Sequence, residues 1–109
     1  MNKDDLIYIE HILECLDKIE LYIDGFSEES FSEDSKTQDA VIRQFEIIGE
    51  ATRNISEALK EKYPDIPWKD MAGMRNKLIH HYFGVDISMV WKTALEDAPE
   101  LKRLIEGID

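Results

Sequence analysis

Apolar residues in the first quarter of the chain recur with the period of an α-helix. They are spaced alternately by three and four positions, at Ile9, Ile12, Leu16, Ile19 and Ile23. This spacing is typical of a helix that packs lengthwise against another helix. It predicts a helix over about residues 4–24, which Gly25 ends. Beyond it, an acidic stretch over residues 24–34 predicts a connecting loop with room for one helical turn from Ser27.

A second apolar line predicts the longest helix of the chain, over residues 35–63. The buried positions of this helix are expected to be Val41, Phe45, Ile48, Thr52, Ile55 and Leu59. Ser35 and Gln38 form a capping-box pattern at its start, and Pro64 ends it. At 1.5 Å per residue, such a helix would be roughly 40 Å long.

Two further lines on the same predicted helix differ in character. Ile42, Gly49 and Ser56 recur every seven residues, and the small ones would let another backbone approach closely. A charged stripe occupies positions three and four apart, at Arg43, Glu46, Glu50, Arg53 and Glu57. We interpret this stripe as a solvent-exposed face with ion pairs rather than as a functional carboxylate pair.

Shorter helices are predicted in the second half of the chain. One runs over residues 67–83, with Trp68, Met71, Met74 and Leu78 facing inward and Gly84 ending it. Another follows an N-cap at Asp86, and a last amphipathic segment begins at Pro99. The sequence shows no alternation with the period of a β-strand. We therefore expect a single domain over residues 1–109, an all-α antiparallel bundle of four to six helices.

Composition limits the classes of function. A formal net charge of -11 argues against a general nucleic-acid-coating protein, since phosphate contacts need Lys and Arg. The stretch of residues 66–84 is an exception, because Lys69, Arg75 and Lys77 outnumber Asp70 there. No apolar run is long enough for a membrane span. Cys15 is the one cysteine; we expect it to be a core residue and the protein to be cytoplasmic.

The same stretch contains an unusual group of polar side chains. Arg75, His80, His81 and Tyr82 fall within eight residues. A guanidinium can bind two phosphate oxygens at once, and an imidazole exchanges protons near neutral pH. For RNA, His80 would deprotonate the 2′-hydroxyl or protonate the leaving oxygen, while Arg75 stabilises the charge developing on the phosphate. These residue types suit phosphodiester cleavage, but the Arg-x-x-x-x-His spacing by itself is also common among ordinary polar residues near the end of a helix.

The spacing of Arg75 and His80 sets a geometric condition. Five residues on a regular helix place two side chains about 140° apart, so one helix would not aim both at one phosphate. Either the helix loosens near His80, or a second subunit supplies its own copy across a twofold axis. We expect a symmetric dimer. The sequence contains neither a carboxylate cluster nor a cysteine pair that would suggest a metal site. The adjacent His80 and His81 would point in different directions on a helix. We therefore expect metal-independent chemistry without a cofactor.

The motif resembles that of a known family. Residues 75–82 match the Arg-x-x-x-x-His-x-Tyr pattern of HepT-type toxins in the HEPN ribonuclease superfamily. Flanking segments are similar as well: residues 46–51 (EIIGEA), 66–68 (IPW), 72–74 (AGM), 82–86 (YFGVD) and 96–101 (EDAPEL). The resemblance covers nearly the whole chain in order.

The resemblance implies a dimeric, helical ribonuclease toxin with Arg75 and His80 as catalytic residues and Asn76 in support. It implies transfer RNA or messenger RNA as substrate. It also implies a partner antitoxin, a nucleotidyltransferase of the MNT or MntA type, which uses ATP and magnesium to transfer AMP onto Tyr82. An adenylyl group would add bulk and negative charge on the face of Arg75 and repel RNA. The role of His81 stays open.

Two other interpretations compete with the ribonuclease toxin. The chain could be a non-catalytic module that binds a nucleotidyltransferase, and would then form that complex without cleaving RNA. It could also be a structural homodimer with the motif buried at its interface, and would then bind neither RNA nor a partner enzyme. Replacing His80 by alanine separates these hypotheses, because only the first predicts a loss of cleavage and of growth inhibition.

Overall fold

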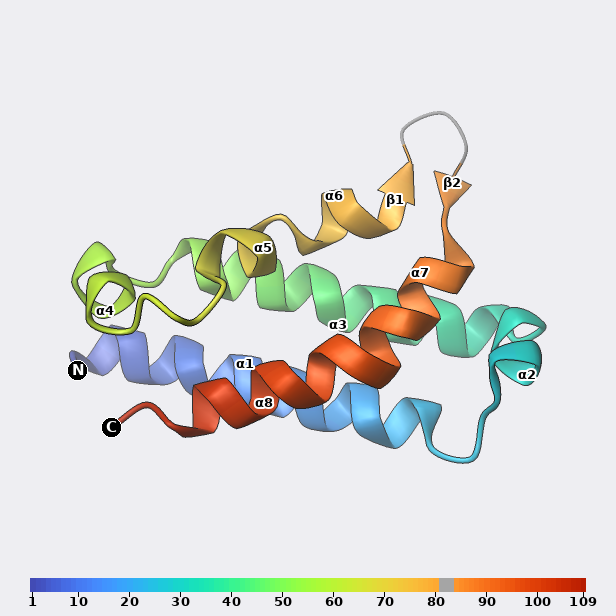
Figure 1. Ribbon diagram of the computed structural model, residues 1–109, viewed down its shortest axis with the longest axis horizontal. Helices are drawn as coiled ribbons and strands as arrows, with labels where there is room; N and C mark the ends of the chain where they lie inside the picture. Colours follow the sequence, from blue (N-terminus) through green and yellow to red (C-terminus); the bar gives the residue numbers. More distant parts are fainter. Residues whose placement is uncertain (81–83) are drawn as a thin grey trace.

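Two antiparallel helices form the base of the fold. The computed structural model describes the backbone of residues 1–80 and 84–109 and the side chains of residues 1–78 and 84–109. Helices α1 (Lys3–Ile23) and α3 (Ser35–Arg53) lie side by side and run in opposite directions (Figure 1). The predicted all-α class is confirmed.

The first helix matches its prediction closely. The side chain of Asn2 caps it by accepting a 2.7 Å hydrogen bond from the backbone N–H of Asp5. Gly25 follows the last turn with a φ of 81°, a conformation that favours glycine. Four of the five predicted apolar positions are buried, and Ile23 is partly buried against the core. Cys15 is also buried, which confirms its interpretation as a core residue.

The connector between α1 and α3 contains one short helix, α2 (Glu28–Ser32). It starts at Ser27, as expected, through a capping box in which Ser27 and Ser30 bond each other's backbone N–H groups. Phe31 from this helix is fully buried, and its ring centroid lies 5.3 Å from that of Trp91. The acidic connector is thereby fixed to the C-terminal part of the chain.

The start of α3 differs from the prediction. Asp34, not Ser35, is the N-cap residue, and its carboxylate accepts a 3.0 Å bond from the N–H of Thr37. The Gln38 side chain does not close a capping box but donates to the carbonyl oxygen of Phe31 at 2.8 Å. The predicted capping box was wrong because a carboxylate one residue earlier caps the helix instead.

The predicted helix over residues 35–63 is divided in two. It stops at Arg53, and α4 (Glu57–Lys62) begins after Ser56. Asp5 on α1 accepts bonds from both the N–H (2.9 Å) and the hydroxyl (2.6 Å) of Ser56, which itself caps α4. This tertiary contact fixes the break. Ile55 and Leu59 are nevertheless buried, so the apolar line was predicted correctly across it.

The predicted helix over residues 67–83 is also interrupted. It consists of α5 (Trp68–Ala72) and α6 (Met74–Leu78), followed by the two-residue strand β1 (Ile79–His80). This strand pairs antiparallel with β2 (Gly84–Val85), although no strand was expected. Gly84, with a φ of 77°, therefore belongs to a strand and does not end a helix. The four residues predicted to face inward are buried: Trp68, Met71, Met74 and Leu78.

The last two predicted helices are joined into one run. It comprises α7 (Ile87–Lys92), the π-helical turn η1 (Thr93–Asp97) and α8 (Ala98–Glu106). Asp86 caps it as predicted, accepting a 3.0 Å bond from the N–H of Met89. The backbone N–H of Ala98 donates to the carbonyl oxygen of Thr93, five residues earlier, which is the hydrogen bond of a π-helical turn. Pro99, the next residue, has no backbone N–H to donate. Because the α3–α4 and α5–α6 breaks each divide one predicted helix, the described residues contain more helical segments than the four to six expected.

The arrangement of these segments positions the site. Helices α5 and α6 pack on α3, while the run from α7 to α8 crosses α1 (Figure 1). Buried side chains from all of them form the core between these layers. None of the helices in the described ranges is both long and apolar enough to cross a lipid bilayer.

Candidate active site

Helix α6 presents the motif arginine at the protein surface. Met74 and Leu78 anchor this helix in the core, being 4% and 0% exposed, while the three residues between them are exposed. Arg75 therefore has a fixed backbone and an accessible side chain, of which 56% is exposed. Its Nε atom lies 3.2 Å from Oε2 of Glu46 on α3.

A close backbone approach fixes the helix that precedes α6. A Cβ atom on Gly49 would lie only 3.2 Å from the carbonyl oxygen of Ala72, so glycine permits this contact between α3 and the end of α5. Arg53 donates to the same carbonyl from Nη2 at 2.8 Å, and to Glu50 from Nη1 at 2.7 Å. The predicted approach of another backbone is confirmed at Gly49.

The predicted charged stripe, whose last member Glu57 lies on α4, is thus an exposed face with ion pairs, as interpreted, and its α3 part also supports the site. Glu46 and Arg53 reach across to α6 and α5, respectively. A groove of about 440 Å³ lies along this contact; it is lined by Arg43, Glu46, Gly49, Glu50, Arg53, Arg75 and Asn76. Three guanidinium groups and two carboxylates therefore share one concave surface.

The backbone of His80 is outside the helix that holds Arg75. Helix α6 ends at Leu78, and His80 lies in β1 opposite Gly84. The backbone N–H of Asp86 donates to the carbonyl of Leu78 at 3.0 Å, which continues this pairing. The angle of about 140° between Arg75 and His80 on a regular helix therefore does not apply, because α6 ends at Leu78, before His80. His81, Tyr82 and the side chain of His80 lie outside the described residues.

The structure thus brings Arg75 and Asn76 together in one groove, and it adds residues that sequence reasoning had not assigned to the site. Glu46 and Arg43 were interpreted only as members of a solvent-exposed stripe. The available signal was their spacing with Glu50 and Arg53, but nothing in that spacing indicated which helix they would face. In the described ranges no three His, Cys, Asp or Glu side chains form a metal-binding group, and metal independence stays a prediction.

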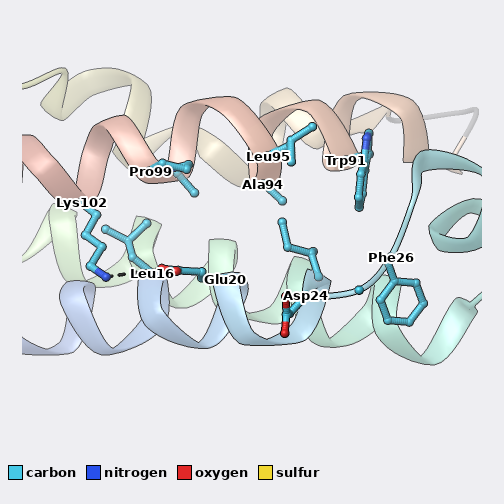
Figure 2. Close-up of a pocket in the computed structure, with 12 residues that line it drawn as sticks. Leu16, Glu20, Asp24, Phe26, Trp91, Ala94, Leu95, Pro99 and Lys102 are labelled. Carbon is cyan, nitrogen blue, oxygen red and sulfur yellow. Dashed lines mark hydrogen bonds and ion pairs between the residues drawn. The ribbon is translucent and has the colours of Figure 1, made fainter.

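A second cavity, of about 430 Å³, has a different character. It lies between the C-terminal half of α1 and the run from α7 to α8, with Leu16, Trp91, Ala94 and Leu95 on its walls (Figure 2). Lys102 at its edge binds Asp17 and Glu20, and these contacts raise the pKa of Lys102. Its described lining includes neither arginine nor histidine, so this cavity lacks the guanidinium groups with which the α3–α6 groove could bind a phosphate.

Comparisons with known proteins identify the class to which this helical bundle belongs. A family model described as "Ribonuclease HepT-like" matches residues 12–108. The chain therefore belongs to the HepT-like ribonuclease family, within the HEPN class that the motif resembled.

Several relatives are similar over the whole chain. A "Probable ribonuclease HepT" of Thermococcus cleftensis is 49% identical over 99% of this chain and 98% of its own length. A "Gamma-glutamylcyclotransferase and putative RNase" of Methanocaldococcus jannaschii is 48% identical over 100% of this chain, which spans 51% of that protein. A "Putative RNase" of Caldanaerobacter subterraneus subsp. tengcongensis is 43% identical over 93% of this chain and 90% of its own. No solved structure matches.

Proposed function

We propose that this HepT-like protein is the toxin of a type VII HEPN/MNT toxin–antitoxin pair and cleaves RNA in the cytoplasm without a metal ion. The observation that carries the proposal is the placement of Arg75, the arginine of the family motif, at an accessible groove on a helix anchored in the core. The relatives named as ribonucleases support the same class of reaction.

Arg75 is suited to bind the scissile phosphate. Glu46 engages its Nε atom, and within the described residues the two terminal nitrogens have no hydrogen-bond partner. These nitrogens form the fork that binds two phosphate oxygens. Asn76 lines the same groove and can donate its amide hydrogens to RNA.

His80 carries the proton transfer in this proposal. The ribose 2′-oxygen attacks phosphorus, the bond to the 5′-oxygen breaks, and a 2′,3′-cyclic phosphate forms. The 2′-hydroxyl loses one proton and the leaving oxygen gains one, so the step needs neither a metal nor a redox partner. His80 either takes the first proton or delivers the second, and the equivalent histidine of a second subunit is available for the other in a symmetric dimer.

Regulation would act on Tyr82. The antitoxin nucleotidyltransferase, which holds ATP and magnesium, would transfer AMP so that the tyrosine oxygen bonds the α-phosphorus and pyrophosphate leaves. Tyr82 belongs to the same short motif as Arg75, and an adenylyl phosphate near that arginine would compete with RNA for its positive charge.

The decisive test is cleavage of labelled transfer RNA and messenger RNA by the purified protein in EDTA. Arg75→Ala and His80→Ala should each abolish cleavage. Arg103→Ala and His11→Ala are matched controls, because both replace exposed residues on other helices. Full cleavage by His80→Ala would contradict the proposal, and cleavage that requires added metal would contradict its metal-free mechanism.

The partner and the modification need a separate experiment. The protein is co-expressed with a nucleotidyltransferase of the MNT type, and the intact mass is measured after incubation with ATP and magnesium. A gain of one AMP that Tyr82→Phe removes and Tyr22→Phe keeps supports the regulatory model. A stable complex with no ribonuclease activity in the free protein would instead support a non-catalytic binding module.

A further inference from the structure

One arginine beside the candidate active site makes no ion pair within the part of the chain that the structure describes. Arg43 on α3 is exposed and lines the groove that also contains Arg75 and Asn76. The other charged residues of α3 in this groove each make an ion pair: Glu46 with Arg75, and Glu50 with Arg53. Within the described residues, Arg43 has neither an ion pair nor a hydrogen bond from its side chain.

These pairings leave the groove with a local positive charge. Its lining contains three arginines and two glutamates, a balance of +1 in a chain whose formal net charge is -11. Since both carboxylates are engaged, the uncompensated charge resides at Arg43. An acidic protein repels nucleic acid over most of its surface, so an unpaired guanidinium is most useful where a phosphate must approach.

The positions of Arg43 and Arg75 suit contacts with two phosphates of one RNA strand. Arg43 precedes Glu46 by three residues, which is slightly less than one helical turn and a rise of about 4.5 Å along α3. Because Glu46 binds Arg75, the two arginines enter the groove at neighbouring levels. Arg53 lies about two turns after Glu46 on α3. Its terminal nitrogens donate to Glu50 and to the backbone carbonyl of Ala72, and the latter bond links α3 to α5.

We infer that the groove between α3 and α6 is a binding subsite for the backbone of single-stranded RNA, in which Arg43 contacts a phosphate next to the scissile one. Such contacts position a strand but carry no sequence information. This inference rests on the proposed ribonuclease function. It adds a contact that binds the RNA backbone beside the phosphate that is cleaved. Arg43 is a binding residue here and takes no part in proton transfer.

Salt dependence of RNA binding tests the inference. The dissociation constant of a fluorescent single-stranded RNA of mixed sequence is measured from 50 to about 300 mM salt, with the His80→Ala protein so that the RNA stays intact. Adding Arg43→Ala should weaken binding about tenfold at low salt, as expected for one lost charge-assisted contact. The plot of log affinity against log salt should also become shallower by about 0.7, the value for one phosphate on a single strand.

Three control variants make the result specific. Arg103→Ala removes another exposed arginine and should leave both affinity and slope unchanged. Arg43→Lys should retain the slope, because it keeps the charge, and its melting temperature should equal that of Arg43→Ala. Arg75→Ala should flatten the slope to a similar degree.

Failure of this inference is distinguishable from failure of the proposed function. If Arg43→Ala binds RNA like Arg103→Ala while the parent protein cleaves and His80→Ala does not, the subsite is overturned and the ribonuclease stands. If Arg43→Ala changes the sedimentation mass and not the salt slope, the groove is an interface between copies, which also overturns it. A flattened slope in a protein that does not cleave RNA would keep the subsite and reject the nuclease.

Discussion

Arg75 on α6 and Glu46 on α3 are joined through a single edge of the guanidinium, with Nε 3.2 Å from Oε2. The two residues are 29 positions apart in the chain. Because the Arg75 side chain is 56% exposed and that of Glu46 is 31% exposed, this pair adds little to stability, typically less than about 1 kcal/mol. The ion pair instead restricts the positions that the Arg75 guanidinium can adopt.

Replacing Glu46 should therefore affect the rate of cleavage and not the fold. Glu46→Ala is expected to lower kcat about tenfold or more, since a misplaced phosphate-binding group weakens transition-state stabilisation. Glu46→Gln keeps an acceptor oxygen and should restore most of the loss. Single-turnover and steady-state kinetics separate kcat from KM. Glu100→Ala, which removes another exposed arginine partner, is the control; equal kinetics for Glu46→Ala and Glu100→Ala would show that the pair is irrelevant to catalysis.

The close contact at Gly49 predicts a loss of activity with little loss of stability. In Gly49→Ala the new Cβ would meet the Ala72 carbonyl at 3.2 Å, so the end of α5 must move by a few tenths of an ångström. The higher helix propensity of alanine, worth about 1 kcal/mol, opposes the cost of that movement. Cleavage should fall about 3- to 10-fold, because α6 and Arg75 follow α5 directly.

Gly107→Ala is the matched control for that change. Its Cβ would lie 3.3 Å from the carbonyl of Leu104, a comparable contact at the end of α8. Gel-based cleavage assays together with thermal melts distinguish the two variants. Should both retain full activity, the approach of α3 to α5 would not govern the position of Arg75.

Asp5 should be important for stability although it lies at a helix start. It is 3% exposed and accepts bonds from the N–H and the hydroxyl of Ser56, 51 residues away. Asp5→Ala leaves both donors without that acceptor and should lower the free energy of unfolding by about 2–3 kcal/mol. Urea denaturation measures the effect, and Asp4→Ala, at an exposed neighbouring position, should change it by less than about 0.5 kcal/mol. Equal stability of the two variants would contradict this assignment.

Burial of Cys15 predicts a pH dependence at alkaline pH. Desolvation raises the pKa of this thiol above its ordinary value of 9.0. Between the pKa of the unfolded and of the folded state, the native protein binds more protons, so its free energy of unfolding falls as pH rises. This contribution is complete below pH 9 and is lost as pH rises through the folded-state pKa.

Comparison with Cys15→Ala isolates that contribution from other groups that titrate at alkaline pH. The stability difference between the parent protein and the variant should shrink as pH rises above 9. Native Cys15 should also react slowly with a thiol reagent and become reactive upon unfolding. Rapid reaction in the native state, or a constant difference from pH 7 to 10.5, would disprove the expected shift.

The amino-acid pattern predicted most of the buried apolar positions and the resemblance to the HepT-type family. Periodic apolar positions such as Ile12, Ile48 and Ile55 predicted the core correctly, because burial of apolar surface depends on a pattern that is local and repeated. The motif at residues 75–82 predicted the ribonuclease family for the same reason, since it is contiguous in the chain. Its catalytic assignment stays a prediction that the experiments above can test.

The ends of the helices and the surroundings of Arg75 depend on contacts between segments that are distant in the sequence. The break after Arg53 is fixed by a carboxylate from α1, and the end of α6 by pairing of residues 78–80 with residues 84–86. Likewise, Glu46 faces Arg75 because Gly49 lets α5 approach α3. Each of these features is a specific contact between segments separated in the sequence. A hydrogen bond or ion pair of this kind has no period along the chain, so its partner becomes identifiable only once the helices are packed.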